Sequence, residues 1–281
     1  MKIFLTGGTG FVGSHFLNQA LQAGHDVIAL KRPGAISRVP VAGDPVWVEG
    51  ALDGDYRDSL KGVDALVHLA SHTPNPPYDT LERCLYWNVF ASMQLAQQAV
   101  EQGVTKFLVA GSCFEYGRSA ETVPEVDADT PMAPTSSYPT SKAAASVAFL
   151  GLARELQLQL KLLRIFQVYG EGEQATRLWP SLRKAAQEGR DFPMSCGAQV
   201  RDFIAVEEVA GQLVKALDFT NVQAGNPLVG HIATGQPQTL LNFVQHWWQH
   251  WGATGQVQVG AVPYRANEMM RLVSAPGALR V

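Results

Sequence analysis

Short apolar stretches alternate with longer amphipathic stretches along the chain as far as Phe166. The apolar stretches predict β-strands over Lys2–Thr6, Asp26–Leu30, Ala65–Leu69, Phe107–Ala110 and Leu160–Phe166. The longer stretches predict helices over Phe11–Ala23, Leu81–Glu101 and Tyr138–Leu156. Because strands that alternate with helices pair in parallel and are covered on both faces, the sequence predicts an α/β fold with a doubly wound parallel sheet.

The pattern changes after about residue 170, where short helices, proline turns and isolated strands follow. The sequence therefore predicts a dinucleotide-type domain over residues 1–170, to which later segments return. Residues 171–281 are expected to form mostly a smaller substrate-binding region. Ligands on open α/β sheets bind beyond the carboxyl ends of the strands, which is where such a region would cover them.

Composition narrows the class of protein. The chain has 281 residues, 46% of them hydrophobic, and a net charge of −3 without a long basic run, which disfavours nucleic acid or an anionic membrane as a partner. The apolar stretches are shorter than a membrane span, so a cytoplasmic protein is expected. Three scattered cysteines predict no disulfide framework, and the histidine pairs His68/His72 and His246/His250 predict no metal site.

A glycine-rich loop follows the first predicted strand. Gly7, Gly10 and Gly13 match G-x-x-G-x-x-G, while Gly8, Gly10 and Gly13 match G-x-G-x-x-G. Glycine permits the tight turn and lets the backbone approach a phosphate, and the following helix offers free N–H groups at its N-terminus. Placed between a strand and a helix, the loop predicts a Rossmann-type site for the pyrophosphate of a dinucleotide.

The end of the second predicted strand bears on the choice of cofactor. In NAD-binding domains an acidic residue about 20 positions after the glycines holds the ribose hydroxyls. Here Lys31 and Arg32 stand at the strand end, whereas Asp26 lies at its start. Two cations at this place fit a 2′-phosphate, so the sequence favours NADP, with NAD as the alternative if they only begin a solvated loop.

Tyr138 and Lys142 form a Tyr-x-x-x-Lys pair that opens a predicted helix. Their spacing of four places both side chains on one helix face. A nearby lysine cation is expected to lower the pKa of the Tyr138 phenol from about 10 toward the range useful for proton transfer. Ser112 follows the preceding strand, where its hydroxyl could hold a substrate carbonyl oxygen.

With these features the sequence resembles the extended short-chain dehydrogenase/reductases, especially the nucleotide-sugar epimerases, dehydratases and reductases. The resemblance is carried by TGGTGFVG at 6–13, VDALVHLAS at 63–71, GSCFEYG at 111–117, SSYPTSK at 136–142, LRIFQVYG at 163–170 and VRDFIAVEEVA at 200–210. PYRANE at 263–268 is similar to the family's late arginine motif. The resemblance implies an NAD(P)-dependent enzyme with a nucleotide sugar as its small-molecule substrate.

The resemblance also implies roles for individual residues. Ser112, Tyr138 and Lys142 would form the catalytic triad, Lys142 would hold the nicotinamide ribose, and Asn88 resembles a helix asparagine that supports the site. The cofactor would contact Gly7, Gly10, Phe11, Val12, Gly13, Lys31, Arg32, Leu52, Leu69, Ala70, Ser71, Asn88, Tyr138 and Lys142. The substrate would contact Cys113, Glu115, Gln167, Arg201 and Arg265. Each arginine would face a diphosphate or, alternatively, form a structural ion pair.

Two departures from the family pattern bear on function. Ala51 stands where many members have an adenine-binding aspartate, and Asp53 is a candidate substitute. Cys113 and Phe114 stand where the similar dehydratases have an Asp-Glu pair, and phenylalanine cannot move a proton, which disfavours dehydration. Cys113 is either a small apolar residue or an acid–base group in a 3,5-epimerisation.

Three functions remain open at this point. The first is an NADP(H)-dependent 4-ketoreductase acting on a nucleotide-linked keto-deoxysugar, with Tyr138 as proton donor. The second is a nucleotide-sugar 4-epimerase that retains NAD, and the third is a non-catalytic cofactor sensor. The long predicted helix over Leu81–Glu101 is also a candidate homodimer contact, as in similar dimers.

Overall fold

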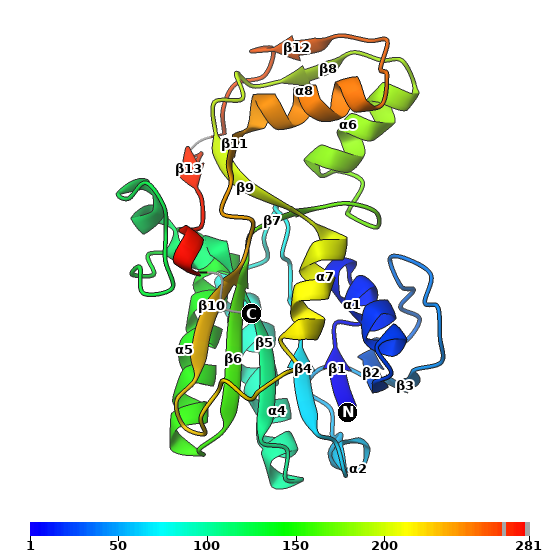
Figure 1. Ribbon diagram of the computed structural model, residues 1–281, viewed down its shortest axis with the longest axis vertical. Coiled ribbons are helices and arrows are strands. Elements are labelled where there is room, and N and C mark those ends of the chain that lie inside the picture. The colour runs from blue at the N-terminus through cyan, green and yellow to red at the C-terminus, as the bar shows by residue number, and fades with distance from the viewer. Residues whose placement is uncertain (266–267, 279–281) are drawn as a thin grey trace.

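The computed structural model describes residues 1–265 and 268–278, and its centre is a seven-stranded parallel sheet (Figure 1). The strand order is β10-β6-β5-β4-β1-β2-β3. These strands span β1 Lys2–Thr6, β2 Asp26–Lys31, β3 Val46–Glu49, β4 Ala65–His68, β5 Lys106–Ser112, β6 Gln159–Ile165 and β10 Leu228–Ile232. The predicted α/β fold with a Rossmann-type doubly wound sheet is confirmed.

Helices cover both faces of this sheet because side chains alternate along each strand. Ile3 and Leu5 of β1 face one side, where α1 (Phe11–Gln22) and α7 (Val206–Lys215) pack on them. Phe4 faces the other side, which is covered by α2 (Arg57–Leu60), α4 (Ser92–Glu101) and α5 (Ser137–Glu155). All three β1 side chains are fully buried, as expected for an inner parallel strand.

The helix predicted over Leu81–Glu101 begins and ends at those residues, but it is not one regular helix. It consists of α3 (Leu81–Leu85), the π-helical segment η1 (Tyr86–Ala91) and α4. A π-helix has i→i+5 hydrogen bonds and widens the turn, and such segments are frequent at functional sites. Asn88 lies inside this segment and is buried.

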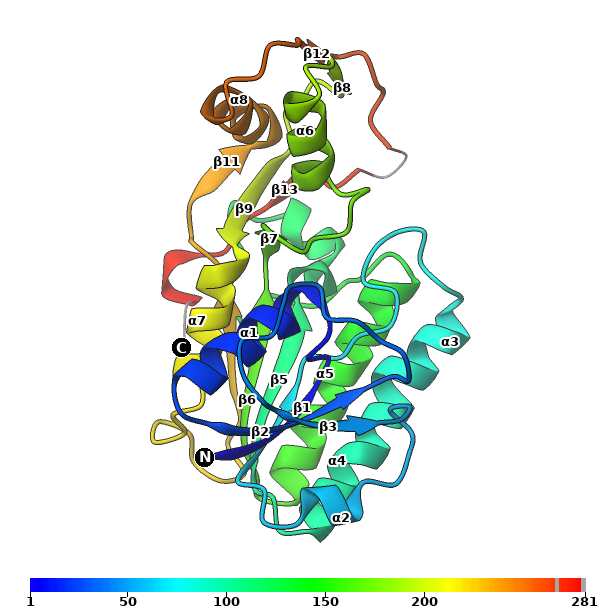
Figure 2. The same cartoon turned by 90° about the vertical axis from the view of Figure 1, so that its right-hand side faces the viewer.

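A smaller lobe stands above the carboxyl ends of the strands (Figure 2). It contains a four-stranded sheet, in which β9 pairs with β7, β11 and β13, and a pair of helices beside a two-stranded ribbon. Its elements are β7 Gln167–Tyr169, α6 Leu178–Gln187, β8 Phe192–Met194, β9 Val200–Ala205, β11 Pro237–Thr239, α8 Leu240–His250, β12 Val257–Val259 and β13 Arg271–Leu272. In the sequence, α7 and β10 stand between β9 and β11 of the lobe, but both pack with the large sheet. A domain boundary near residue 170 stays a prediction.

The strand order reverses at β1, whose neighbours are β2 and β4. In doubly wound sheets the ligand crevice lies beyond the carboxyl ends of the strands at such a switch point. The glycine loop after β1 and the segment after β4 therefore meet at the expected cofactor position. Within the described residues, no helix is both long enough and apolar enough to span a membrane.

Candidate active site

The glycine loop after β1 is shaped by close backbone contacts. Gly7 has a φ of +78°, and a Cβ added there would lie 2.6 Å from the backbone nitrogen of Ala70. A Cβ added at Gly13 would lie 2.0 Å from the carbonyl oxygen of Gly7. The N-cap residue of α1, Gly10, has no side chain to bond the first helical N–H groups. These residues fit a pyrophosphate, which would accept hydrogen bonds from the helix N-terminus.

The predicted adenosine end of the cofactor site lies at the carboxyl end of β2. Lys31 Nζ is 3.0 Å from Glu49 Oε1 and 5.3 Å from the centre of the Trp47 ring. Lys31 and Trp47 line a cavity of about 410 Å³ that Thr9, from the glycine loop, also borders. Arg32, the next residue, is exposed.

The candidate substitute for the missing adenine-binding aspartate is engaged by another side chain. Asp53 Oδ2 accepts a hydrogen bond of 2.7 Å from the Tyr86 hydroxyl, while Leu52 packs against the buried cluster around α4. The structure thus places Asp53 beside η1, and its predicted adenine contact stays a prediction.

Ser112 is the last residue of β5 and the N-cap of the short 3₁₀ helix η2 (Cys113–Tyr116). Its Oγ accepts a hydrogen bond of 3.3 Å from the Phe114 N–H, and its own N–H donates to Glu115 Oε1 over 2.7 Å. This reciprocal pair is a capping box, which fixes both the backbone and the side chain of the N-cap residue. Ser112 is 6% exposed, so its side chain is buried at the carboxyl end of β5.

Tyr138 and Lys142 lie in the first turns of α5 and are both buried. The Ser71 and Ser112 side chains lie close enough to the Tyr138 hydroxyl to lower its pKa, and Lys142 Nζ donates to the Ala110 carbonyl over 2.7 Å. The expected lowering of the Tyr138 pKa by Lys142 is wrong for this structure. Burial raises the pKa of Tyr138 above that of a free phenol, only partly opposed by the two serine hydroxyls. The phenol is therefore protonated at neutral pH.

Asn88 connects three segments of the site. Its Oδ1 accepts from the His72 N–H over 2.7 Å, and its Nδ2 donates to Ser141 Oγ over 2.9 Å. Ser141 Oγ in turn donates to the Tyr138 carbonyl over 2.8 Å. The amide thus joins the segment after β4 to the first turn of α5, which fits the supporting role implied by the family resemblance. Its direct contact with a cofactor stays a prediction.

The residues expected to bind substrate do not all face the crevice. Gln167 is half-buried in β7, and the exposed Arg265 is near enough to Tyr78 to affect its pKa. Arg201 is mostly buried and pairs with Glu268 over 3.1 Å, so this structure shows the ion-pair alternative for that residue. Of the late arginine motif, Ala266 and Asn267 lie outside the described residues.

The structure bears on two predictions beside Ser112. Cys113 is 2% exposed and packs among Tyr116, Phe166 and Leu272, and burial raises the pKa of its thiol, which keeps it protonated and unsuited to acid–base chemistry. Glu115 is fully buried, and both of its carboxylate oxygens accept hydrogen bonds within the protein. Its contact with a substrate stays a prediction.

The sequence analysis missed a loop that covers Tyr138. The Tyr78 ring lies 5.4 Å from the Tyr138 ring at an interplanar angle of 31°. Ser137 Oγ donates to the Asp79 carbonyl over 2.7 Å, and Asn75 Nδ2 donates to Gln174 Oε1 over 2.9 Å. The loop is thereby tied to α5 on one side and to the segment before α6 on the other. Apart from its prolines, no residue pattern marked it.

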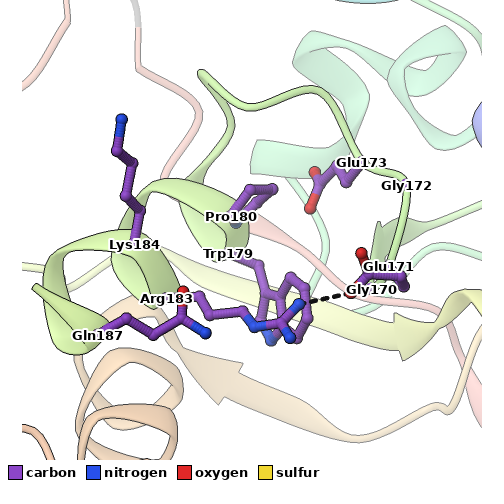
Figure 3. A pocket seen from close by; sticks show the side chains of 9 residues that line it. All are labelled: Gly170, Glu171, Gly172, Glu173, Trp179, Pro180, Arg183, Lys184 and Gln187. Atoms are coloured by element: carbon purple, nitrogen blue, oxygen red, sulfur yellow. Dashed lines mark hydrogen bonds and ion pairs between the residues drawn. The ribbon is translucent and has the colours of Figure 1, made fainter.

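A second missed feature is a cavity of about 400 Å³ between α6 and the segment after β7 (Figure 3). Glu173 lies on its wall with a side chain only 7% exposed, 3.5 Å from Arg177. Its Oε2 has no hydrogen-bond partner among the described residues, and burial raises the pKa of Glu173 to about 7. Figure 3 also shows Arg183 turned across the Trp179 ring toward Glu171, with which it forms an ion pair of 2.5 Å.

Taken together, the crevice places a protonated phenol and a serine hydroxyl side by side, beyond a loop suited to a dinucleotide. A phenol donates a proton to a developing alkoxide, and a neighbouring hydroxyl holds the same oxygen by a hydrogen bond. Phe114, at the place of the dehydratase carboxyl pair, carries no titratable proton. The arrangement is suited to adding hydride to a carbonyl carbon, or removing it from the corresponding alcohol carbon, with proton transfer at the attached oxygen.

Comparison with known proteins agrees with this chemistry. The chain is 26% identical over 272 residues to a UDP-glucose 4-epimerase of Corynebacterium glutamicum, covering 87% of this chain and 79% of that protein. It is 23% identical over 280 residues to dTDP-6-deoxy-L-talose 4-dehydrogenase (NAD(+)) of Aggregatibacter actinomycetemcomitans, covering 98% and 100% of the two chains.

Among solved structures, MoeE5 in complex with UDP-glucose and NAD superimposes with a TM-score of 0.83 at 26% identity, covering 99% of this chain and 91% of that chain. The family model described as "NAD dependent epimerase/dehydratase family" matches residues 3–229, well over half of the chain. The protein therefore belongs to the NAD dependent epimerase/dehydratase family, whose members are enzymes of the extended short-chain dehydrogenase/reductase type.

Proposed function

We propose that the protein is an NADPH-dependent 4-ketoreductase of a nucleotide-linked keto-deoxysugar. The observation that carries this proposal is the protonated Tyr138 phenol, close enough to Ser112 for that side chain to lower its pKa, together with Phe114 at the position of the dehydratase carboxyls. The similar 6-deoxy-L-talose 4-dehydrogenase has a name that describes the same kind of interconversion, and it matches this chain over its full length. The substrate class is taken from such relatives and not from the geometry alone.

In the proposed reaction Tyr138 donates its proton to the oxygen at C4 of the sugar while Ser112 Oγ holds that oxygen. The reduced nicotinamide cofactor supplies the hydride when bound. Lys142, on the same helix face as Tyr138, would hold the nicotinamide ribose. The Ala110 carbonyl, in β5, orients the Lys142 ammonium by accepting its hydrogen bond.

The experiment is to follow NADPH consumption with a panel of nucleotide-4-keto-6-deoxysugars, for the wild type and for Tyr138→Phe. Turnover that Tyr138→Phe reduces by about 10²- to 10⁴-fold, the usual contribution of a general acid, supports the proposal. Tyr86→Phe is the control, because it also removes a phenol hydroxyl, but from the exposed pair with Asp53. Undiminished turnover in Tyr138→Phe would refute the role of the phenol.

The preference for NADP rests on Lys31 and Arg32. A 2′-phosphate would compete with Glu49 for Lys31, because the two lie 3.0 Å apart. Lys31→Ala is expected to weaken NADPH by about 10-fold or more, the loss of one charge-assisted hydrogen bond, and to leave NADH unchanged. Equal or tighter binding of NADH by the wild type would refute the preference.

A 4-epimerase that retains NAD is the second candidate, and the UDP-glucose 4-epimerases among the similar proteins favour it. It would use the same three residues and return the hydride to the opposite face of the sugar. NAD that stays with the protein through purification, with interconversion of UDP-sugars and no net cofactor consumption, would replace the first proposal with this one.

We also propose that two copies pair through η1 and α5. Phe90 and Val147 are 64% and 58% exposed, and η1 packs beside α5, so these side chains form part of an uncovered apolar face with Tyr86. Light scattering is expected to give a dimer for the wild type and a monomer for Phe90→Glu. Val46→Glu, at a 62% exposed position on β3, is the control and is expected to remain a dimer. A monomeric wild type would refute the pairing.

A further inference from the structure

Glu115 is a fully buried carboxylate directly beneath Ser112. Its Oε1 accepts the Ser112 N–H over 2.7 Å. Its Oε2 accepts from Ser146 Oγ on α5 over 2.8 Å and from Arg164 Nε on β6 over 2.9 Å. One side chain therefore ties the end of β5 to the neighbouring strand and to the helix that carries Tyr138.

Arg164 is itself held firmly. Its Nη1 donates to the Tyr116 hydroxyl over 2.8 Å and to the Ala128 carbonyl over 3.0 Å, and its guanidinium lies 4.8 Å from the centre of the Tyr116 ring. The Tyr116 hydroxyl also pairs with His231 of β10 over 2.5 Å. Glu115 is thus fixed by partners on two adjacent strands, so its carboxylate has little freedom to turn away from Ser112.

The sequence makes room for this arrangement at Gly111. A Cβ added at that residue would lie 3.0 Å from Glu115 Oε1 and 2.9 Å from Arg164 Cγ. Any side chain at this position would push the carboxylate away from the Ser112 N–H. The glycine one residue before Ser112 is therefore required by the buried pair and not by the backbone conformation.

We infer that Glu115 is a positioning residue for Ser112. By accepting the Ser112 N–H in the capping box of η2, Glu115 fixes the direction of the serine hydroxyl. Ser112 Oγ uses one lone pair to accept the Phe114 N–H, and that bond exists only while Ser112 is the N-cap of η2. With the backbone pinned by Glu115, the hydroxyl hydrogen and the second lone pair are left for Tyr138 and for the substrate oxygen. The inference rests on the proposed function, because it needs a reaction in which Ser112 acts.

The test is a double-mutant cycle on the nucleotide sugar that the wild type turns over. Glu115→Gln is expected to lower kcat about 10- to 100-fold, with KM and cofactor Kd unchanged, because a misaimed donor loses part of the about 10²- to 10³-fold that one oxyanion donor contributes. In the Ser112→Ala background, Glu115→Gln is expected to add no further loss, since the group it positions is gone. Losses that multiply would overturn the inference.

Two further variants separate positioning from stability. Tyr116→Phe removes the hydroxyl shared by Arg164 and His231, so it weakens the same network while leaving the Glu115–Ser112 bond, and its kcat is expected to stay unchanged. Glu115→Asp keeps the counter-charge of Arg164 but is one methylene shorter, and its kcat is expected to fall as well. If Glu115→Gln and Glu115→Asp are both recovered only unfolded, Glu115 is a structural residue and the inference is overturned.

Failure of the proposed function is read from the wild type alone, as an absence of turnover on the panel. In that case amide hydrogen exchange at Ser112 still tests the cap. Exchange is expected to be slow in the wild type and in Tyr116→Phe. It is expected to be fast in Glu115→Gln, because an amide that turns its single oxygen toward the Arg164 guanidinium sets its NH2 group against the Ser112 N–H. Fast exchange in the wild type, or equally slow exchange in Glu115→Gln, would overturn the inference whatever the substrate.

Discussion

Gly13→Ala is the change that most directly tests the cofactor loop. A Cβ at residue 13 would lie 2.0 Å from the carbonyl oxygen of Gly7 and 2.7 Å from its carbonyl carbon. Non-bonded contacts of a Cβ essentially never fall below 3.0 Å, so the first turn of α1 must withdraw from the loop by about 1 Å. That movement strains the hydrogen bond of 2.8 Å from the Gly10 N–H to the same Gly7 oxygen.

The size of the effect follows from two opposing contributions to the free energy of unfolding. Alanine in place of glycine stabilises a helix by about 1 kcal/mol. Overpacking of a tight contact costs about 1–3 kcal/mol. The net change in stability is therefore small, at most a loss of about 2 kcal/mol. Cofactor binding should suffer more, because each charge-assisted hydrogen bond to the pyrophosphate contributes about 1.5–3 kcal/mol, and losing one weakens Kd about 10-fold or more.

Gly151→Ala is the matched control. Gly151 is an exposed residue inside α5, and a Cβ added there meets no described atom within 4 Å. The same substitution should therefore stabilise this helix by about 1 kcal/mol and leave cofactor affinity unchanged. Urea unfolding gives the two stabilities, and titration with NADPH and NADH gives the affinities. A Gly13→Ala protein that binds either dinucleotide with the wild-type Kd would refute the assignment of this loop as the pyrophosphate site.

Two further predictions concern buried carboxyls away from the phosphate loop. Burial places the folded pKa of Glu173 at about 7, above the ordinary 4.5, so the folded protein holds this proton more tightly and stability falls as the pH rises between those values. Glu173→Gln is therefore expected to raise the free energy of unfolding by up to about 3 kcal/mol at pH above 7 and to change little at acid pH, and urea unfolding without such a pH difference would contradict it. Asp202 is fully buried, and its Oδ1 and Oδ2 accept hydrogen bonds from the Thr234 and Gly235 N–H groups respectively. Asp202→Asn would make an amide NH2 group face one of these two N–H donors. It should cost about 1–3 kcal/mol in thermal unfolding, whereas the same change at the exposed Asp129 should cost almost nothing.

The fold could be predicted from the sequence wherever local pattern and burial agree. The strand over Lys2–Thr6 is apolar on both faces because the sheet is covered on both, and its predicted bounds match the structure. The strand predicted over Phe107–Ala110 is longer in the structure, extending to Lys106 and Ser112, because polar or small residues at strand ends weaken an apolar pattern. The π-helical segment could not be predicted, since a shift in hydrogen-bond register has no clear signature in residue type.

The site was less accessible to sequence reasoning where contacts are long-range. Glu115 stands three residues after Ser112, and the family resemblance implied a substrate contact for it. The 3₁₀ turn instead brings its carboxylate back beneath Ser112, where Arg164, far along the chain, meets it. Tyr78 lies in a loop without periodicity, and only the tertiary fold brings its ring against Tyr138.

The state of Tyr138 also bears on the proposed proton transfer. A reductase must begin its cycle with a protonated acid, and burial raises the Tyr138 pKa so that the phenol holds its proton across the neutral range. Lys142 does not reverse this, because burial lowers its own pKa and Glu115 is the nearby charge that favours its ammonium form. The protein's own residues therefore keep Tyr138 in the protonated form that the proposed reduction requires.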